Sequence, residues 1–294
     1  MLTSSYAALR CQSIEKMLHG LIPEKQDTPH SLLFESARYS LLSAAKRLRP
    51  LLTLATAESF GAHMDICLYP ACAIEMVHTY SLIHDDLPCM DDDDLRRGKP
   101  SLHKVVGEGQ AVLTGDYLLT YAFEVLCKSP GISDTQKVDL IKTLAQRAGG
   151  DGMVGGQAVD LLSEGKPADW PTLQFIHHHK TAALLCASIE FGAILANVSE
   201  QDRRHLEVIG YEAGLAFQII DDILDVIGSE KDLGKPIRSD LDHQKCTAVS
   251  VLGLPGAQSI ANKLRESIRT RCKMLSVDAY LLNQILEQLI HRTS

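Results

Sequence analysis

Apolar residues recur every three or four positions along most of this 294-residue chain, the spacing that gives a helix one apolar face. Prolines fall between these runs, where they begin or end helices instead of breaking them. The pattern predicts helices over residues 3–19, 30–47, 51–60, 65–86, 110–128, 133–148, 172–197, 200–227, 256–274 and 277–291. No Asn-Gly or Asp-Gly pair lies between alternating strands, and no Pro- or Ser-rich linker divides the chain. We therefore predict a single all-α domain over residues 1–294, a bundle of about ten or more helices.

Two of the predicted helix starts carry capping residues. Ser133 is followed three positions later by Gln136, and Ser199 by Asp202. In such pairs the first side chain accepts a hydrogen bond from an amide of the first turn, and the second side chain reaches back to the cap. We expect helices to begin beside both serines.

Residues 75–99 combine an apolar helix end with many carboxylates. Asp85 and Asp86 end the helix, four consecutive aspartates begin at Asp91, and two arginines follow. An acidic run alone is more often a solvated loop than a site. Here the first two aspartates continue a helix with apolar neighbours, and carboxylates that enter a core are paired or bound to metal. With the arginines, which suit phosphate, the segment indicates a magnesium and diphosphate site.

A second acidic cluster lies in residues 214–226. Asp221 and Asp225 stand four residues apart on one helix face, and Gln218 lies about one turn before Asp221. The positions around them are apolar, so a solvated acidic face does not explain them. Carboxylates at this spacing can hold Mg²⁺ beside a phosphorylated substrate. We expect the two clusters to face each other across a cavity between helices.

The two clusters carry a family resemblance that covers nearly the whole chain. The sequences DDLPCMD (Asp85 to Asp91) and DDILD (Asp221 to Asp225) resemble the two aspartate-rich motifs of the trans-isoprenyl diphosphate synthase family, and most closely its bacterial short-chain farnesyl branch. The resemblance implies helices around a central cavity and a homodimer, with residues 110–148 as the candidate interface. It also implies three Mg²⁺ ions per site, for which Mn²⁺ can substitute. The metal ligands that it implies are Asp85, Asp86, Asp91, Asp221 and Asp225.

The resemblance implies a reaction as well. Isopentenyl diphosphate condenses head-to-tail with an allylic diphosphate, either dimethylallyl or geranyl diphosphate. Departure of the allylic diphosphate leaves a cation, and the double bond of isopentenyl diphosphate attacks it. The residues that the resemblance makes catalytic are Asp85, Asp86, Lys180, Thr181, Gln218 and Asp221.

Residues 44–50 (AAKRLRP) carry a group of basic side chains. Taken alone, they are typical of cations that complement the dipole at a helix C-terminus. The family has a Gly-Lys-x-x-Arg-Pro motif here that binds the diphosphate of isopentenyl diphosphate, and Lys46 and Arg49 match it, with Ala45 in place of Gly. His78 matches a histidine that contacts the diphosphate. The isopentenyl-side ligands that the resemblance implies are Lys46, Arg49, His78 and Arg97.

Two further segments resemble the allylic side of the family's site. Residues 155–160 match a Gly-Gly-Gln-x-x-Asp motif that lines the cavity. In residues 177–185 (HHHKTAALL), Lys180 and Thr181 match a Lys-Thr pair, and Ala182, which replaces a Gly, is expected to narrow the pocket. The three histidines point in different directions on a helix, so we do not expect them to share an ion. The allylic-side ligands that the resemblance implies are Arg96, Lys180, Thr181, Gln218, Lys235 and Lys245.

The last two of these lysines belong to residues 228–247, a polar segment broken by Gly and Pro. Its composition predicts a mobile loop. In the family, lysines at the positions of Lys235 and Lys245 reach the allylic diphosphate when the loop closes. Arg238 replaces a common Gly, and Cys246 a common Ser or Ala, so both substitutions bear on that closure.

Product length is expected to depend on the helix before the first cluster. Ser81 and Tyr80 lie four and five residues before Asp85, about 6 and 7.5 Å back along the axis. Ser81 shares the face of Asp85, whereas Tyr80 lies roughly 140° around the helix, so periodicity leaves a core tyrosine and a pocket floor equally open. In the farnesyl branch an aromatic residue at one of these positions forms the floor. The resemblance therefore implies farnesyl diphosphate, with geranyl and geranylgeranyl diphosphate as alternatives.

Composition narrows the partner and the compartment. A formal net charge of −8 argues against nucleic acid, and no apolar stretch is expected to reach membrane-spanning length. The eight cysteines form no CxxC pair and lie mostly among apolar residues, which indicates reduced thiols and a cytoplasmic protein. A plastid protein trimmed of its transit peptide would look the same.

Two other functions on the same fold remain open from the residues. A terpene cyclase ionises one prenyl diphosphate and needs no isopentenyl site, so Lys46, Arg49, His78 and Arg97 count against it. A non-catalytic partner subunit usually lacks one aspartate cluster, and both clusters are whole here.

Overall fold

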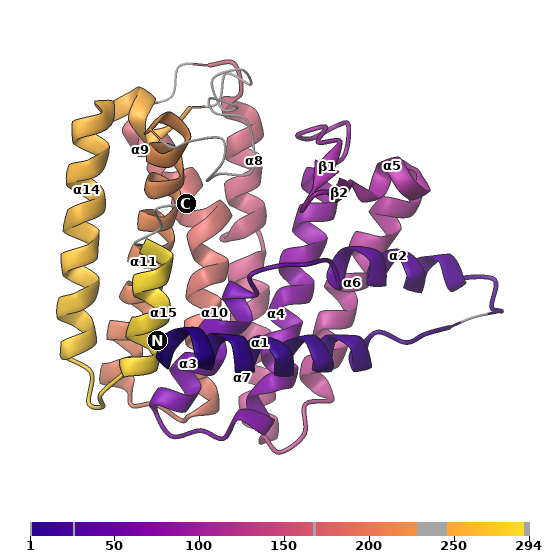
Figure 1. Ribbon diagram of the computed structural model, residues 1–294, viewed down its shortest axis with the longest axis horizontal. Coiled ribbons are helices and arrows are strands. Elements are labelled where there is room, and N and C mark those ends of the chain that lie inside the picture. Colours follow the sequence, from indigo (N-terminus) through magenta and orange to yellow (C-terminus); the bar gives the residue numbers. More distant parts are fainter. Residues whose placement is uncertain (1, 26, 167–168, 228–245, 291–294) are drawn as a thin grey trace.

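The computed structural model describes residues 2–25, 27–166, 169–227 and 246–290. Most of these residues are helical, which confirms the all-α prediction (Figure 1). The helices are α1 (Leu2–Leu21), α2 (Ser31–Leu41), α3 (Leu48–Ser59), α4 (Met64–Asp85), α5 (Leu102–Val106), α6 (Glu108–Cys127), α7 (Asp134–Ala148), α8 (Met153–Ser163), α9 (Trp170–Ile176), the π-helical turn η1 (His177–Ala182), α10 (Ala183–Leu195), α11 (Glu200–Ile227), α14 (Ala248–Lys273) and α15 (Tyr280–Ile290). Within these ranges the only strands are the short β1 (Leu95–Arg96) and β2 (Lys99–Pro100).

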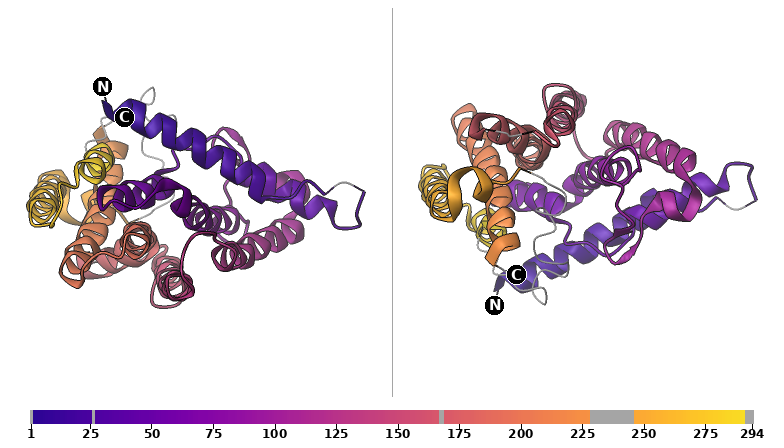
Figure 2. Two further views of the ribbon diagram at one scale, coloured as in Figure 1. Left: turned by 90° about the horizontal axis from the view of Figure 1, so that it is seen from below. Right: turned by 90° about the horizontal axis from the view of Figure 1, so that it is seen from above.

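The core lies where the long helices pack side by side. Helix α10 is buried on nearly all sides because α3, α4, α7 and α11 enclose it. Helix α4 packs along α3 and α6. In Figure 2 many of the helices are seen end-on, whereas α1 lies lengthwise across them. The apolar positions of the sequence pattern therefore meet at the centre of a helical bundle.

Helix α4 corrects one expectation about membranes. Its length and composition would allow it to cross a membrane, although no apolar stretch was expected to reach that length. However, 72% of its most apolar window is buried among the other helices, as in the core helix of a soluble fold.

Predicted helix boundaries hold where caps or strong periodicity mark them. Helix α11 has the predicted bounds, and Ser199 Oγ accepts a hydrogen bond from the Asp202 amide at 3.2 Å. Ser133 and Gln136 form a complete capping box at the start of α7. The helix predicted over 30–47 ends at Leu41 instead.

The helix predicted over 172–197 also differs from the structure. It consists of α9, the turn η1 and α10, and η1 carries Lys180 and Thr181. Single π-helical turns inside α-helices are frequent at functional sites, and apolar periodicity does not reveal them.

The strands β1 and β2 form a hairpin that the sequence pattern missed. Its two turn residues, Arg97 and Gly98, have φ values of 54° and 75°, and positive φ at both positions is typical of the tight type I′ turn. Asn-Gly and Asp-Gly are the usual signals of this turn, and an arginine in the first position hides it. The hairpin matters for the site because it carries Arg96 and Arg97.

Candidate active site

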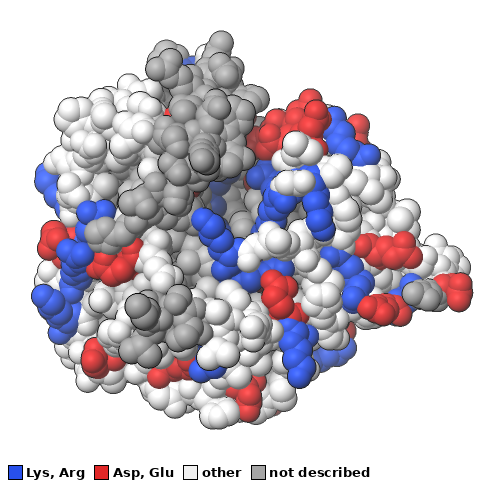
Figure 3. Space-filling view, in the orientation of Figure 1, with Lys and Arg blue, Asp and Glu red and all other residues white. Residues whose placement is uncertain are grey.

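A cavity of about 900 Å³ lies at the centre of the bundle, between α4, α8, η1, α11 and the segment before α3. Figure 3 shows Lys and Arg side chains gathered around a hollow in the middle of one face, beside a group of Asp and Glu. Many of the residues predicted for the site line this one cavity: Lys46, Arg49, His78, Tyr80, Ser81, Asp85, Arg96, Arg97, Lys180, Thr181, Gln218 and Asp221. Segments up to 175 positions apart in the sequence therefore meet as the motifs implied.

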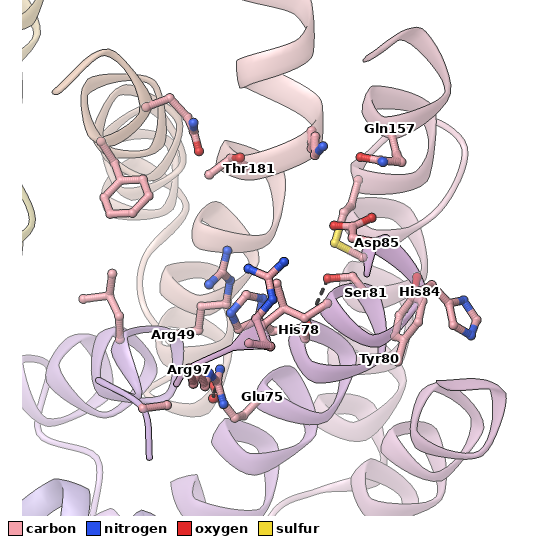
Figure 4. Close-up of a pocket in the computed structure, with 18 of the residues that line it drawn as sticks. Arg49, Glu75, His78, Tyr80, Ser81, His84, Asp85, Arg97, Gln157 and Thr181 are labelled. Carbon is pink, nitrogen blue, oxygen red and sulfur yellow. Dashed lines mark hydrogen bonds and ion pairs between the residues drawn. The ribbon is translucent and has the colours of Figure 1, made fainter. Parts of the chain in front are cut away.

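One part of the cavity wall is cationic. Arg49, His78 and Arg97 lie close together in Figure 4. Burial, and then the charge of Arg97, lower the pKa of Arg49 to about 10, although Glu75 opposes this shift. Arg49 Nε is buried and donates no hydrogen bond within the described residues, so it remains available to an anion. Burial and the neighbouring arginines hold the pKa of His78 well below its usual range, which keeps this imidazole neutral.

Arg47 is the centre of a buried ion-pair network that reaches Arg97 and that the sequence pattern did not predict. It has a left-handed backbone (φ 47°) and is 2% exposed. Its guanidinium donates to Glu15 at 2.6 Å, to Glu75 at 2.8 Å and to the Leu41 carbonyl at 2.7 Å. Glu75 also lies 3.8 Å from Arg97. A buried acid inside an apolar helix was the sequence signal that could have pointed to this network.

The same segment corrects the helix-dipole interpretation. Lys46 and Arg47 stand before the first residue of α3, so these cations lie at a helix N-terminus instead of a C-terminus. The positive end of the helix dipole adds to their charge there. The arrangement attracts an anion such as a diphosphate.

The first acidic cluster divides between the cavity and a buried ion pair. Asp85 lines the cavity, and burial raises the pKa of its carboxyl to about 6 although Lys180 opposes the shift. Asp86 is 2% exposed and accepts a hydrogen bond from Arg96 Nε at 2.8 Å. The Arg96 guanidinium also contacts Asp93 at 2.6 Å. Arg96 thus joins the two halves of the acidic segment.

The second acidic cluster divides in the same way. Asp221 lines the cavity, whereas Asp222 and Asp225 are buried outside it. The Ala248 amide donates to Asp222 Oδ2 at 2.6 Å, so this carboxylate ties α11 to the start of α14. Of the five predicted metal ligands, Asp85 and Asp221 line the cavity, and Asp86, Asp91 and Asp225 do not.

This donor set fits Mg²⁺. Mg²⁺ prefers carboxylate oxygens and is usually held by one or two of them together with water and substrate phosphates. No three metal-ligating side chains converge on one point in the described ranges. Asp85 and Asp221 would therefore share such an ion with oxygens from the substrate.

Lys180 is held over the cavity by Asp160, the last residue of the Gly-Gly-Gln-x-x-Asp motif, which was expected to line the cavity. Its Nζ donates to Asp160 Oδ2 at 2.6 Å, and Asp160 is absent from the cavity wall. Burial opposes the charge of Lys180, but Asp160 and Asp85 outweigh it, so the pKa of Lys180 is raised. Thr181, Gln157 and Gln218 complete this side of the cavity.

Glycines near η1 serve helix packing. A Cβ atom on Gly156 of α8 would lie 2.7 Å from His179 C and 2.7 Å from Lys180 Cα, so the backbones of α8 and η1 approach each other here. Ala182 is fully buried outside the cavity, where it faces Gly214 of α11. The expectation that Ala182 narrows the pocket is therefore wrong, because its methyl group points into helix packing.

The three histidines at the start of η1 make separate contacts. His177 is buried and lies 3.9 Å from Asp222. The ring of His178 stacks on Tyr211, and that of His179 on Phe175. The rings of His178 and His179 also lie 5.0 Å apart, but each packs on a different aromatic residue. Lys235, Lys245 and Arg238 lie outside the described residues, and Cys246 is partly buried at their edge.

A helical bundle whose central cavity joins two aspartate-bearing helices to a set of arginines and lysines defines an enzyme of the isoprenoid synthase type. The family model "Polyprenyl synthetase" matches residues 30–285. The chain belongs to the polyprenyl synthetase family.

Relatives and a solved structure agree with this family. The chain is 44% identical to a farnesyl diphosphate synthase of Geobacillus stearothermophilus over 278 residues, which cover 94% of this chain and 93% of that protein. It is 42% identical to a geranylgeranyl diphosphate synthase of Cyanophora paradoxa over 292 residues (99% and 96%). It is also similar to a solved Helicobacter pylori geranyltransferase complexed with magnesium and isoprenyl diphosphate. That similarity has a TM-score of 0.86 and 35% identity and covers 99% of this chain and 97% of the other.

Proposed function

We propose that the protein is a short-chain trans-prenyltransferase that condenses isopentenyl diphosphate with dimethylallyl or geranyl diphosphate to give farnesyl diphosphate. One observation carries the proposal: Asp85 and Asp221 line the same cavity as the cationic group of Lys46, Arg49 and Arg97. A carboxylate pair suits a metal-bound diphosphate, and the cations suit a second diphosphate. The cavity thus has separate places for two diphosphates.

Isopentenyl diphosphate would bind at the cationic wall. Lys46, Arg49 and Arg97 would donate to its diphosphate, helped by the N-terminus of α3. His78, whose pKa is lowered by burial and then by the neighbouring arginines, is neutral and can donate one hydrogen bond without adding charge. Arg47 donates to Glu75, and Glu75 lies 3.8 Å from Arg97, so this one donor is kept in place before the substrate arrives.

The allylic diphosphate would lie between the two aspartate helices. When bound there, Mg²⁺ neutralises the charge that develops on a departing diphosphate; we propose three ions, or Mn²⁺ in their place. Lys180, oriented by Asp160, donates to the same diphosphate. The oxygens of Thr181 and Gln218 stabilise the allylic cation electrostatically. The isopentenyl double bond then forms a bond to its C1, and the proton lost from the product passes to the released diphosphate.

Apolar residues protect this cation from water. Met153, Val154, Ala158, Leu161 and Phe217 line the cavity beside the charged groups. A cation exposed to water would be hydrolysed, so a dry wall favours attack by the double bond. The same wall gives the prenyl tail an apolar environment.

Tyr80 supports farnesyl diphosphate as the product. Its side chain is 6% exposed and lines the cavity, where burial, and then Asp85, raise its pKa to about 12, so the phenol stays neutral. A neutral aromatic ring can close an apolar tunnel. The Ser81 hydroxyl donates to the His78 carbonyl at 2.9 Å and leaves the tunnel open.

Product analysis tests the proposal. Purified protein is incubated with labelled isopentenyl diphosphate and each allylic diphosphate, and the dephosphorylated products are separated by reversed-phase chromatography. We expect C15 from wild type and a shift towards C20 in Tyr80→Ala. If the wild-type protein makes mainly C20, its product is geranylgeranyl diphosphate and the farnesyl proposal is wrong. Products that form from one prenyl diphosphate alone would indicate a terpene cyclase, against which the isopentenyl-side cations argue.

We further propose that the protein is a cytoplasmic homodimer folded as one domain. Helices α6 and α7 expose Val112, Leu113 and Val138, a surface that a second copy could cover. No disulfide is recorded among the cysteines of the described residues, as suits a reducing compartment. Sedimentation at micromolar concentration measures the assembly, and a fully active monomer would contradict the dimer.

A further inference from the structure

His84 lies between Tyr80 and helix α6, one residue before the first aspartate motif. It lines the cavity together with Tyr80, and the two rings meet edge to face with centroids 5.7 Å apart at 80°. Figure 4 shows Tyr80 and His84 on one flank of α4 and His78 on the other. His84 is therefore the ring that supports Tyr80 from the side of α6.

Two features of α6 fix the position of His84. Its Nε2 lies 3.0 Å from the Val112 carbonyl oxygen, and because a carbonyl only accepts, Nε2 carries the proton and donates. Gly115, one turn further along α6, is buried against the same ring. A Cβ atom at Gly115 would lie 2.5 Å from His84 Cδ2 and 2.9 Å from Cε1. The imidazole occupies the space that any side chain at this position would fill.

We infer that His84 and Gly115 are positioning residues for product length, which act through Tyr80. The carbonyl of Val112 and the bare Cα of Gly115 set where the imidazole stands, and the imidazole sets how far the Tyr80 ring reaches into the prenyl tunnel. The inference rests on the proposed prenyltransferase function and names residues on two helices that determine its specificity.

The two substitutions have opposite expected effects. His84→Ala removes the support and lets the Tyr80 ring withdraw, so the C20 to C15 ratio should rise, by about tenfold if the freed volume admits even part of another isoprene unit. Gly115→Ala pushes the imidazole by about 1 Å towards Tyr80, since carbon atoms in contact stay roughly 3.5–4.0 Å apart. The tunnel then shortens, and the C10 to C15 ratio should rise.

The double variant and a glycine control separate this mechanism from general damage. With His84→Ala in place, the added methyl group of Gly115→Ala meets no imidazole, so the double variant should give the C20 shift of His84→Ala without extra C10. Gly109 lies on the same helix with nothing within 4 Å of an added Cβ atom, so Gly109→Ala should leave the wild-type profile. Melting temperatures of all variants record whether the fold is kept.

Product ratios decide the outcome. The inference is wrong if both single variants keep the wild-type ratios, or if Gly115→Ala changes the ratio equally with and without His84. Should Gly115→Ala fail to fold, His84→Ala alone still tests the inference. An unchanged C20 to C15 ratio in this variant would show that His84 does not determine where the tunnel ends. A wild-type protein that makes no prenyl product would instead refute the proposed function.

Discussion

Replacing Gly156 by alanine should misplace Lys180 without removing any group that touches substrate. The added Cβ atom would lie 2.7 Å from both His179 C and Lys180 Cα. These are backbone atoms, which cannot swing aside as the end of a side chain can. Because carbon contacts settle at about 3.5–4.0 Å, α8 and η1 must separate by about 1 Å.

The size of the effect follows from that displacement. A misplacement of about 1 Å in a catalytic group can cost about 100-fold in rate, or about 2.7 kcal/mol of transition-state stabilisation. Overpacking of this kind also costs about 1–3 kcal/mol of folding free energy. In a protein of this size that loss lowers the melting temperature by about 2–4 °C per kcal/mol, so the fold should survive.

Steady-state kinetics in which the allylic diphosphate and isopentenyl diphosphate are varied in turn measure this prediction. The variant should lose kcat, while KM for isopentenyl diphosphate changes little, because Lys46 and Arg49 lie on another element. Gly150→Ala is a matched control in the same glycine-rich segment, since an added Cβ atom there meets nothing within 4 Å. A kcat for Gly156→Ala within threefold of the control would refute the idea that the approach of α8 sets the position of Lys180.

Three further predictions address the metal, the two substrates and pH. A chelator should abolish activity, and Asp221→Ala should lower kcat by several powers of ten with the circular dichroism spectrum kept; near-normal turnover would count against a metal role for this carboxylate. Lys46→Ala should mainly raise KM for isopentenyl diphosphate, and Lys180→Ala should mainly lower kcat. The reverse pattern would show that the two diphosphate sites are assigned the wrong way round. Burial, and then Lys180, lower the pKa of His177 to about 4 in the folded protein, whereas its value in the unfolded chain is about 6.5. Between these two pH values the unfolded chain therefore binds more protons than the folded protein. The free energy of unfolding should therefore fall as pH falls through this window, by up to about 3 kcal/mol, and urea titrations of His177→Gln should show a smaller fall.

Local sequence patterns predicted the helices and the groups that bear charge. Helix α11 was predicted with its observed bounds because its apolar face is long and Ser199 caps its start. Asp85 and Asp221 were recognisable since carboxylates among apolar residues need a cationic partner. In such cases the pattern and its structural meaning lie within one helix.

Contacts between distant elements could not be predicted in the same way. The pair of Lys180 and Asp160 joins η1 to α8, and the network of Arg47 joins α1, α4 and the loop before α3. No periodicity relates such positions. The left-handed backbone of Arg47 was hidden as well, because arginine gives no turn signal of the kind that glycine gives.

Glycines directly behind the cavity wall fix distances within it. Gly156 lets α8 meet η1, Gly214 leaves room for Ala182 beneath the same turn, and Gly115 seats His84 against α6. None of the three lines the cavity, yet each packs against an element that carries residues of the cavity wall. Packed interiors have few voids, so a methyl group at such a contact must move a helix or a ring, and the nearest mobile groups are the functional ones. The position of Lys180 over a diphosphate, and the reach of Tyr80 into a prenyl tail, are therefore determined by backbone contacts that no substrate touches.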